Sequence, residues 1–393
     1  MVYIIKKDGT KEEFDANKIK RAVNKSAGRV MYRFTDDEIN FICKYATDRA
    51  EAMSRERKGG KIMIQDMHNI VEGALEQVNP AVAKSYRDYR NYKVDFIHMM
   101  DEVYTKSQSI RYIGDKSNAN TDSALVATKR SLIFNELNKE LYRKFFMNRN
   151  ELQACKDGYI YIHDQSARLD TMNCCLFDVG SVLRGGFEMG NVWYNEPKTL
   201  DTAFDVMGDI ILSTAAQQYG GFTVPEVDKI LSPYAQKSYN KYYEEFLKYS
   251  DPSWEGREEK GRVYAWEKVC RDCDQGWQGI EYKLNTVGSS RGDYPFVTVT
   301  LGLGTGRFEK MISKSLLKVH MGGQGKAGHK KPVLFPKIVF LYDEEIHGDG
   351  KECEDVFETG VACSAKTMYP DWLSMSGQGY ISSMYKKYKK VIS

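Results

Sequence analysis

The sequence lacks the features that would place it in a membrane or on nucleic acid. Its apolar runs fall short of the roughly 18 consecutive residues that a membrane-spanning helix needs. Its charges almost balance, with 57 basic against 54 acidic residues and a net charge of +3. A nucleic-acid-binding protein is expected to show a marked basic excess or stripe. We therefore expect neither a membrane-spanning segment nor a nucleic-acid partner.

Two common ligand-binding motifs are also missing. Cys270 and Cys273 form a lone CxxC pair, and a structural zinc site needs a second pair at suitable spacing. The segment HMGGQGKAGHKKP contains a Gly-Lys pair, but a Walker A loop would need Gly in place of His320 and Ser or Thr in place of Ala327. We therefore expect no metal site and no P-loop.

The cysteine usage indicates the compartment. Eight cysteines stand at irregular spacing in a chain of 393 residues, and the start carries no signal-peptide pattern. This is typical of reduced thiols in the cytosol. The 42% hydrophobic and 28% charged residues are ordinary for a globular protein. We expect a cytoplasmic protein long enough for two or more domains.

The first 95 or so residues form one compositional unit. An alternating segment turns at Asp8-Gly9, which predicts a β-hairpin. Asp15 can cap the helix that follows, because its side chain can accept from a free backbone N–H. The apolar periodicity predicts helices over 16–28, 36–53, 64–78 and 80–92.

Three cations lie near this hairpin and the first helix: Lys6, Lys7 and Lys18. Cations beside a helix N-terminus can hold a polyphosphate. Exposed lysines are, however, commonly only solvated. From charge alone both interpretations stay open.

The remaining residues contain short strand-like runs and longer helical stretches. The run 337–342 is continuous and apolar, as expected for a buried strand. Charged residues over 250–262 favour a surface loop. We expect strands over 159–163, 174–179, 296–301 and 337–342, and helices over 132–146, 199–219, 224–249, 264–278 and 351–369.

Adjacent cysteines, Cys174 and Cys175, follow Asn173 in the second of these strands. Neighbouring side chains of a strand point to opposite faces, so only one of the two thiols can face a given cavity. His163 ends the preceding strand, where a loop would expose it. A thiol, an amide and an imidazole at strand ends favour a redox or hydrogen-transfer site; the alternative is a buried strand with two inert cysteines.

Eleven motifs, in order along the chain, resemble one known family. The pattern IIKKDG, Phe14, Lys18-Ile19, Tyr86-Arg87 and Tyr89-Arg90 resembles the ATP-cone, a regulatory adenine-nucleotide module. With the motifs that follow, the whole chain is similar to part of the anaerobic (class III) ribonucleoside-triphosphate reductases. These motifs are NANTDS, GYIYIHD, MNCCLFD, GGFEMGN, YGG, SYNKYY, PFVT, GQGK, VLFPKIVF and KTMYPD.

The sequence departs from the family pattern at two places. Lys7 stands where Arg is usual, which keeps the charge but loses the planar fork of donors. Asp293-Tyr294 stands where Gln and a small residue are more usual.

The resemblance implies an α/β fold with two domains: a mostly helical ATP-cone over 1–95, and over 96–393 the first half of a ten-stranded α/β barrel of the glycyl-radical type. The thiyl-cysteine loop and the glycyl-radical motif of the family are absent from the sequence. We therefore expect an incomplete N-terminal portion that needs its other half to reduce ribonucleoside triphosphates to deoxyribonucleoside triphosphates for DNA synthesis.

The resemblance also implies site residues. Cys174 matches the cysteine that protonates the departing 2′-hydroxyl, with Asn173 beside it and His163 as a further active-site candidate, while Cys175 should lie in the core. Lys198 and Lys241 become phosphate contacts for a specificity effector, although each could equally be a solvated lysine.

The implied cofactors and partners follow from the same family. They are ATP or dATP at the cone, deoxynucleotide effectors, formate as reductant, a radical-SAM activase and a second copy of the chain. The glycyl radical and a zinc site belong to the missing portion. The alternatives are a non-catalytic ATP/dATP-sensing regulator and one subunit of a split enzyme.

Overall fold

The structure, a computed structural model, describes residues 2–6, 8–57, 60–112, 124–168, 172–218, 220–286 and 292–388. The chain divides into two compact units, Met1–Thr105 and Lys106–Ser393. Helix α4 (Pro80–Tyr112) runs without a break past residue 95, where we expected the first domain to end. Among the described residues, no helix has the length and apolar character to cross a membrane.

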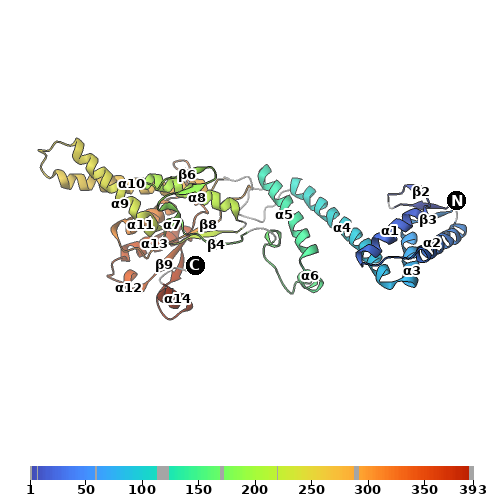
Figure 1. The fold of residues 1–393 in the computed structure, drawn as a ribbon. Helices are drawn as coiled ribbons and strands as arrows, with labels where there is room; N and C mark the ends of the chain where they lie inside the picture. The colour runs from blue at the N-terminus through green and yellow to red at the C-terminus, as the bar shows by residue number, and fades with distance from the viewer. Residues whose placement is uncertain are drawn as a thin grey trace. The chain divides into compact units, whose positions relative to one another are not determined.

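The first unit combines a three-stranded sheet with helices (Figure 1). Strand β1 (Tyr3–Ile5) lies in the middle, antiparallel to β2 (Lys11–Glu13) and parallel to β3 (Lys61–Met63). The expected hairpin is confirmed, with Gly9 at φ +81° in its turn. Three helices precede α4: α1 (Ala16–Arg29), α2 (Asp36–Glu56) and α3 (Ile64–Val78).

Local capping explains where these helices begin. The side chain of Asp15 accepts a hydrogen bond from the backbone N–H of Asn17 at 2.8 Å. Thr35 and Glu38 form a reciprocal capping box at the start of α2, which satisfies backbone N–H groups that have no partner within the helix. The helices and the sheet enclose one core, in which Val23, Ile42 and Ile62 are fully buried.

The second unit is built on a five-stranded parallel sheet in the order β10-β9-β8-β7-β4. All four neighbouring pairs are parallel. The strands are β4 (Cys175–Leu176), β7 (Phe222–Val224), β8 (Val297–Leu301), β9 (Lys337–Tyr342) and β10 (Asp371–Ser374), and a separate hairpin is formed by β5 (Phe187–Met189) and β6 (Val192–Tyr194).

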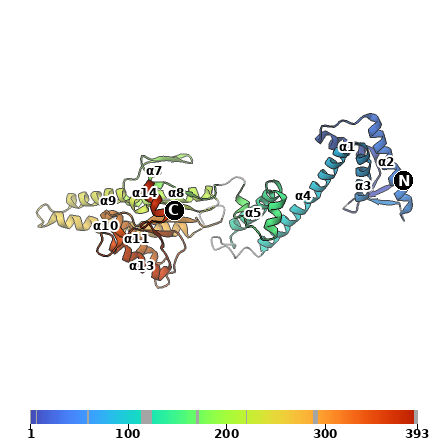
Figure 2. The same cartoon turned by 90° about the horizontal axis from the view of Figure 1, so that it is seen from below.

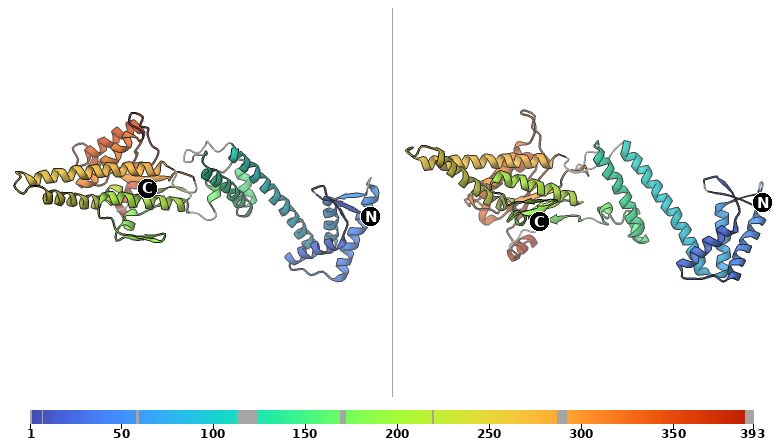
Figure 3. Two further views of the ribbon diagram at one scale, coloured as in Figure 1. Left: turned by 90° about the horizontal axis from the view of Figure 1, so that it is seen from above. Right: turned by 45° about the horizontal axis from the view of Figure 1, so that its top comes forward.

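The helices of the second unit connect these strands. Helices α9 and α10 lie side by side as a long antiparallel pair in Figures 2 and 3. The helices are α5 (Val126–Phe145), α6 (Arg149–Lys156), α7 (Val179–Leu183), α8 (Leu200–Gln217), α9 (Val227–Tyr249), α10 (Arg257–Leu284), α11 (Arg307–Gly322), α12 (Glu344–His347), α13 (Glu354–Thr367) and α14 (Tyr380–Tyr388), with a 3-10 turn η1 (Gln165–Ala167).

The two faces of this sheet are covered differently. Ile338 and Phe340 of β9 pack into the large core formed with the connecting helices. The alternate residues, Val339 and Leu341, face the other way and join a small cluster with Ile381 of α14. The mixed α/β class is confirmed, with the parallel sheet following the mostly helical first unit along the chain.

Several expected elements differ in the structure. Residues 159–163 are not a strand: Tyr159 and Tyr161 are 84% and 85% exposed, and no strand pairs with them in the described residues. The strand expected over 174–179 ends at Leu176, because Asp178 accepts from Ser181 N–H at 2.9 Å and caps α7. Residues 250–262 are only partly a loop, since α10 begins at Arg257.

Candidate functional site

The adjacent thiols lie on opposite sides of the edge strand β4. Cys174, directly before the strand, is exposed, whereas Cys175 is partly buried and packs against the large core. The Cys175 Sγ accepts from the side-chain amide of Gln218 at 2.8 Å. The thiol of Cys174 is thus accessible, whereas that of Cys175 faces the core.

Asn173 and His163 have different surroundings. The backbone carbonyl of Asn173 accepts from Gly220 N–H at 2.8 Å, which joins it to the chain entering β7. His163 lies in a turn before η1, with its side chain 73% exposed and its Nδ1 at 2.5 Å from Asp164 Oδ2. Among the described residues, no contact joins His163 to Asn173 or Cys174.

A buried carboxylate organises the loop that follows β8. Asp228, at the start of α9, is fully buried, and its Oδ2 accepts from Gly302 N–H at 3.1 Å and Gly304 N–H at 3.3 Å. It also accepts from Ser313 Oγ at 3.1 Å. Burial raises the pKa of Asp228, and these hydrogen bonds only partly offset that effect.

A carbonyl oxygen of the same loop accepts a hydrogen bond from a histidine side chain. His347 Nε2 lies 2.9 Å from the Gly302 carbonyl oxygen, so this nitrogen carries the proton and donates. Burial lowers the pKa of His347, which favours the neutral imidazole. The backbone after β8 is therefore fixed at the carboxyl end of the sheet, where parallel sheets commonly carry their ligand sites.

In the first unit, Lys6 and Lys18 converge on one carboxylate. Glu12 of β2 lies 2.8 Å from Lys6 Nζ through Oε2, and its Oε1 pairs with Lys18 Nζ. Three elements, the β1 end, β2 and the first turn of α1, thus bring two cations together. Lys7 lies outside the described residues.

A second charged cluster joins α3 to α4. Glu72 pairs with both Arg87 and Arg90, the latter at 3.0 Å, and Arg87 also pairs with Glu76. Nearby, Tyr86 Oη lies 2.8 Å from His68 Nδ1. Burial raises the pKa of Tyr86 to about 12, so the phenol keeps its proton at neutral pH.

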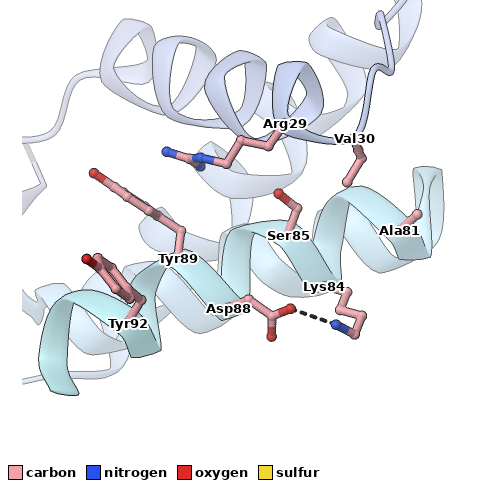
Figure 4. A pocket seen from close by; sticks show the side chains of 8 residues that line it. All are labelled: Arg29, Val30, Ala81, Lys84, Ser85, Asp88, Tyr89 and Tyr92. Atoms are coloured by element: carbon pink, nitrogen blue, oxygen red, sulfur yellow. Dashed lines mark hydrogen bonds and ion pairs between the residues drawn. The ribbon is translucent and has the colours of Figure 1, made fainter. Parts of the chain in front are cut away.

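A shallow cavity of about 360 Å³ lies between the end of α1 and α4 (Figure 4). The Arg29 guanidinium stacks over the Tyr89 ring at 3.7 Å, and Lys84 pairs with Asp88 at 2.7 Å. Arg29 stands eleven residues after Lys18 in α1, which is about 16 Å along a helix. The cavity is therefore separate from the lysine pair at the hairpin.

Lys198 and Lys241 are both exposed, and no contact joins them to each other in the described residues. Lys237, one helical turn before Lys241, binds Glu196 at 2.7 Å and the Pro197 carbonyl oxygen at 3.4 Å. Because Pro197 is adjacent to Lys198, this ion pair connects α9 to the segment that carries Lys198. The hydrogen bond from Lys237 lowers the pKa of Glu196.

Two family models match the chain. The ATP cone domain matches residues 2–94, and anaerobic ribonucleoside-triphosphate reductase matches residues 117–392. The chain belongs to the anaerobic ribonucleoside-triphosphate reductase family.

The similar proteins carry the same description. The reductase of Haemophilus influenzae is 31% identical over 394 residues, which cover 98% of this chain and 53% of that protein. The reductase of Enterobacteria phage T4 is 36% identical over 261 residues, 65% of this chain and 41% of that protein. The chain thus spans about half the length of the curated relatives it matches.

A solved structure of the anaerobic ribonucleotide reductase from Thermotoga maritima, with glycerol in the active site, is 14% identical and has a TM-score of 0.49. The similarity covers 73% of this chain and 50% of that chain.

Several contacts of this chain were not predicted from the sequence. Gln218 and Asp228 act through partners distant in sequence, and no local motif marks their roles. Gly220 lies in the YGG motif and Glu12 lies close in sequence to Lys6 and Lys18, but the motif and the spacing do not show which atoms meet. Within the described residues, no cluster of three or more His, Cys, Asp or Glu side chains is arranged to hold a metal ion.

Proposed function

We propose that this chain is the nucleotide-sensing and N-terminal catalytic portion of an anaerobic ribonucleoside-triphosphate reductase. The complete enzyme reduces ribonucleoside triphosphates to deoxyribonucleoside triphosphates by a radical mechanism. The observation that carries the proposal is the succession of the two family matches over residues 2–94 and 117–392. Exposure of Cys174 beside the edge strand of the parallel sheet supports it.

Cys174 serves as the proton donor to the departing 2′-hydroxyl of the ribose. The S–H bond breaks as the C2′–O bond breaks, and the hydroxyl leaves as water. A neutral thiol within hydrogen-bond reach can give this proton. Asn173 and His163 are further candidates, with Asn173 favoured because it adjoins the thiol, whereas His163 is exposed and pairs with Asp164.

The remaining chemistry belongs to a portion of the enzyme beyond this chain. We assign to that portion the glycyl radical, the thiyl cysteine and a zinc site. Formate supplies the electrons, a radical-SAM activase generates the radical, and two copies of the chain form the working dimer. The 393 residues alone are not expected to reduce ribonucleotides.

The first unit binds ATP or dATP as a regulatory effector. Lys6, Lys7 and Lys18 contact the phosphates, which replace Glu12 as the partner of the two described lysines. Lys198 and Lys241 contact the phosphates of a deoxynucleotide specificity effector, on the surface organised by the Lys237–Glu196 pair.

Calorimetric titration of the purified chain with ATP and dATP tests the proposal. A Lys6→Ala/Lys18→Ala double variant should lose binding, whereas Lys44→Ala, at an exposed position on α2, should retain it. Arg29→Ala should also retain it, because Arg29 lies at the separate cavity. Binding that survives in the double variant, or is lost with Arg29, would contradict the assignment of the hairpin lysines.

The second candidate function is a non-catalytic ATP/dATP-sensing subunit, alone or in a split enzyme. The core of the first unit favours it, because the residues of that core all lie within residues 2–86. Cys174→Ser separates the candidates in an assembly reconstituted with the complementary polypeptide. Loss of ribonucleotide reduction supports the catalytic portion, and unchanged reduction supports the sensing subunit.

A further inference from the structure

The chain that enters β7 runs directly beside the two cysteines. Met172 and Gln218 form a parallel β-bridge. Two residues further on, Gly220 N–H donates to the Asn173 carbonyl at 2.8 Å. The backbone contacts of Gln218 and Gly220 therefore fix the position of the peptide that carries Cys174.

Gly220 leaves no room for a side chain at this point. A Cβ at position 220 would lie 2.7 Å from Cys174 Sγ and 2.4 Å from the Asn173 carbonyl oxygen. The φ angle of Gly220 lies outside the left-handed region, so the backbone conformation does not demand glycine. The requirement is for space, and the thiol of Cys174 uses that space.

Gln218 acts on the other thiol. It is 4% exposed, and its Nε2 donates to Cys175 Sγ at 2.8 Å. Gly220 thus lies close to Cys174 because it has no side chain, whereas Gln218 contacts Cys175 through a hydrogen bond. Gln218 and Gly220 therefore give the two neighbouring thiols different surroundings.

We propose that Gly220 is a positioning residue for the Cys174 thiol, and that Gln218 retains Cys175 on the core side. The inference rests on the proposed role of Cys174 as proton donor, because that role needs a thiol of fixed direction. Any side chain at position 220 displaces the thiol and the peptide between residues 173 and 174.

Thiol reactivity of the full chain tests this. Alkylation by N-ethylmaleimide is followed at each cysteine by mass spectrometry of peptides between about pH 6 and about pH 9, which brackets the usual cysteine pKa. In Gly220→Ala, the rate at Cys174 should fall several-fold and its pH midpoint should rise, because the added methyl group covers Sγ and removes water from the thiolate.

The control is Gly279→Ala in α10, where a Cβ meets no atom within 4 Å. It should leave the rate and pH midpoint at Cys174 unchanged, and Cys155 on α6 should react alike in both variants. A Gly220→Ala chain with the wild-type rate and midpoint at Cys174 would overturn the inference.

A double-mutant cycle covers the case in which Gly220→Ala folds poorly. Cys174→Ala removes Sγ, so the double variant Gly220→Ala/Cys174→Ala should regain part of the melting temperature lost in Gly220→Ala. Additive losses, or a double variant as unfolded as Gly220→Ala, would show that only the backbone conflict matters and would refute the link to the thiol.

These measurements need neither nucleotide nor enzymatic turnover. Absence of ATP binding would count against the proposed function and leave the alkylation result unaffected. A normal Cys174 in Gly220→Ala would count against the positioning role alone.

Discussion

The two units of the chain bury their apolar residues in different ways. In the first, helices and a small sheet enclose a single core, and β1 lies between two partner strands. In the second, the connecting helices cover one face of the parallel sheet, and α14 covers part of the other near β9. Residues of the first unit enclose its core, whereas in the second unit Leu176 of the edge strand stays 43% exposed.

The difference shows what each unit can do alone. A closed core can fold and bind a small ligand at its surface without further contacts. A sheet covered mainly on one side keeps residues such as Cys174 and Leu176 exposed, and it needs another surface opposite them to exclude water from a reaction. Under the proposed function, sensing therefore fits the first unit alone, and catalysis fits the second only in a larger assembly.

The largest expected effect is a loss of stability in the second unit alone. Trp277 of α10 is fully buried and packs edge-on against Phe204, with ring centroids 5.0 Å apart. Trp277→Ala should lower the unfolding free energy of the second unit by about 3–5 kcal/mol. Scanning calorimetry should show the first unit's transition unchanged, whereas an equal shift of both transitions would mean that the cores unfold as one.

Trp254→Ala provides the matched control for that experiment. Trp254 is 50% exposed, and exposed substitutions usually change stability by less than about 0.5 kcal/mol.

A smaller effect concerns the loop after β8. Asp228→Ala leaves the Gly302 and Gly304 N–H groups without their acceptor, which should cost about 2–3 kcal/mol. Since burial raises the folded-state pKa of Asp228 above its unfolded value, its contribution to stability falls as pH rises from about 4 through the folded pKa. Urea unfolding should therefore show a larger gap between wild type and variant near pH 4 than near pH 7.

Asp355→Ala is the control, because the pKa of Asp355 is shifted in the opposite direction. Partial burial of Asp355 raises its pKa, but the hydrogen bond and charge of Lys314 outweigh this and lower it. Its contribution is present above its ordinary pKa of about 3.9 and is lost as pH falls through the lower folded-state pKa, so this gap should be retained at pH 4 and shrink only in stronger acid. The same trend in both variants would contradict the pKa shift of Asp228.

The smallest expected effect lies in the first unit. Glu12→Gln frees Lys6 and Lys18 from a competing carboxylate, so ATP should bind more tightly. A partly exposed ion pair is worth about 0–1 kcal/mol, which limits the gain to about fivefold. Glu13→Gln, on the opposite side of β2, should leave the affinity measured by calorimetry unchanged, and a loss of affinity in Glu12→Gln would contradict phosphate binding at this pair.

Local signals predicted much of the fold. The helix over 64–78 and the strand over 337–342 were predicted with the bounds that the structure has. Apolar periodicity and continuous apolar runs are properties of the segment itself, so they can be read without the rest of the chain. The caps at Asp15 and Thr35 are local in the same sense.

The elements that were predicted wrongly or not at all depend on pairing between segments distant in sequence. Strand β3 was not predicted, because its parallel partner β1 lies more than fifty residues earlier. Residues 159–163 have an apolar pattern, but no strand among the described residues pairs with them, so the prediction of a strand was wrong. The opposite placement of Cys174 and Cys175 follows from strand geometry alone, whereas the contact with Gly220 depends on how two segments meet.

The exposure of Cys174 also governs how the protein must be handled. All eight cysteines lie within the described residues, and Cys174 is the one classed as exposed. In air, an accessible thiol can proceed to sulfenic acid and then couple to a second thiol. A covalent pair formed between two Cys174 side chains would run as a dimer on a non-reducing gel, so the oligomeric state must be measured in an oxygen-free buffer with a reductant.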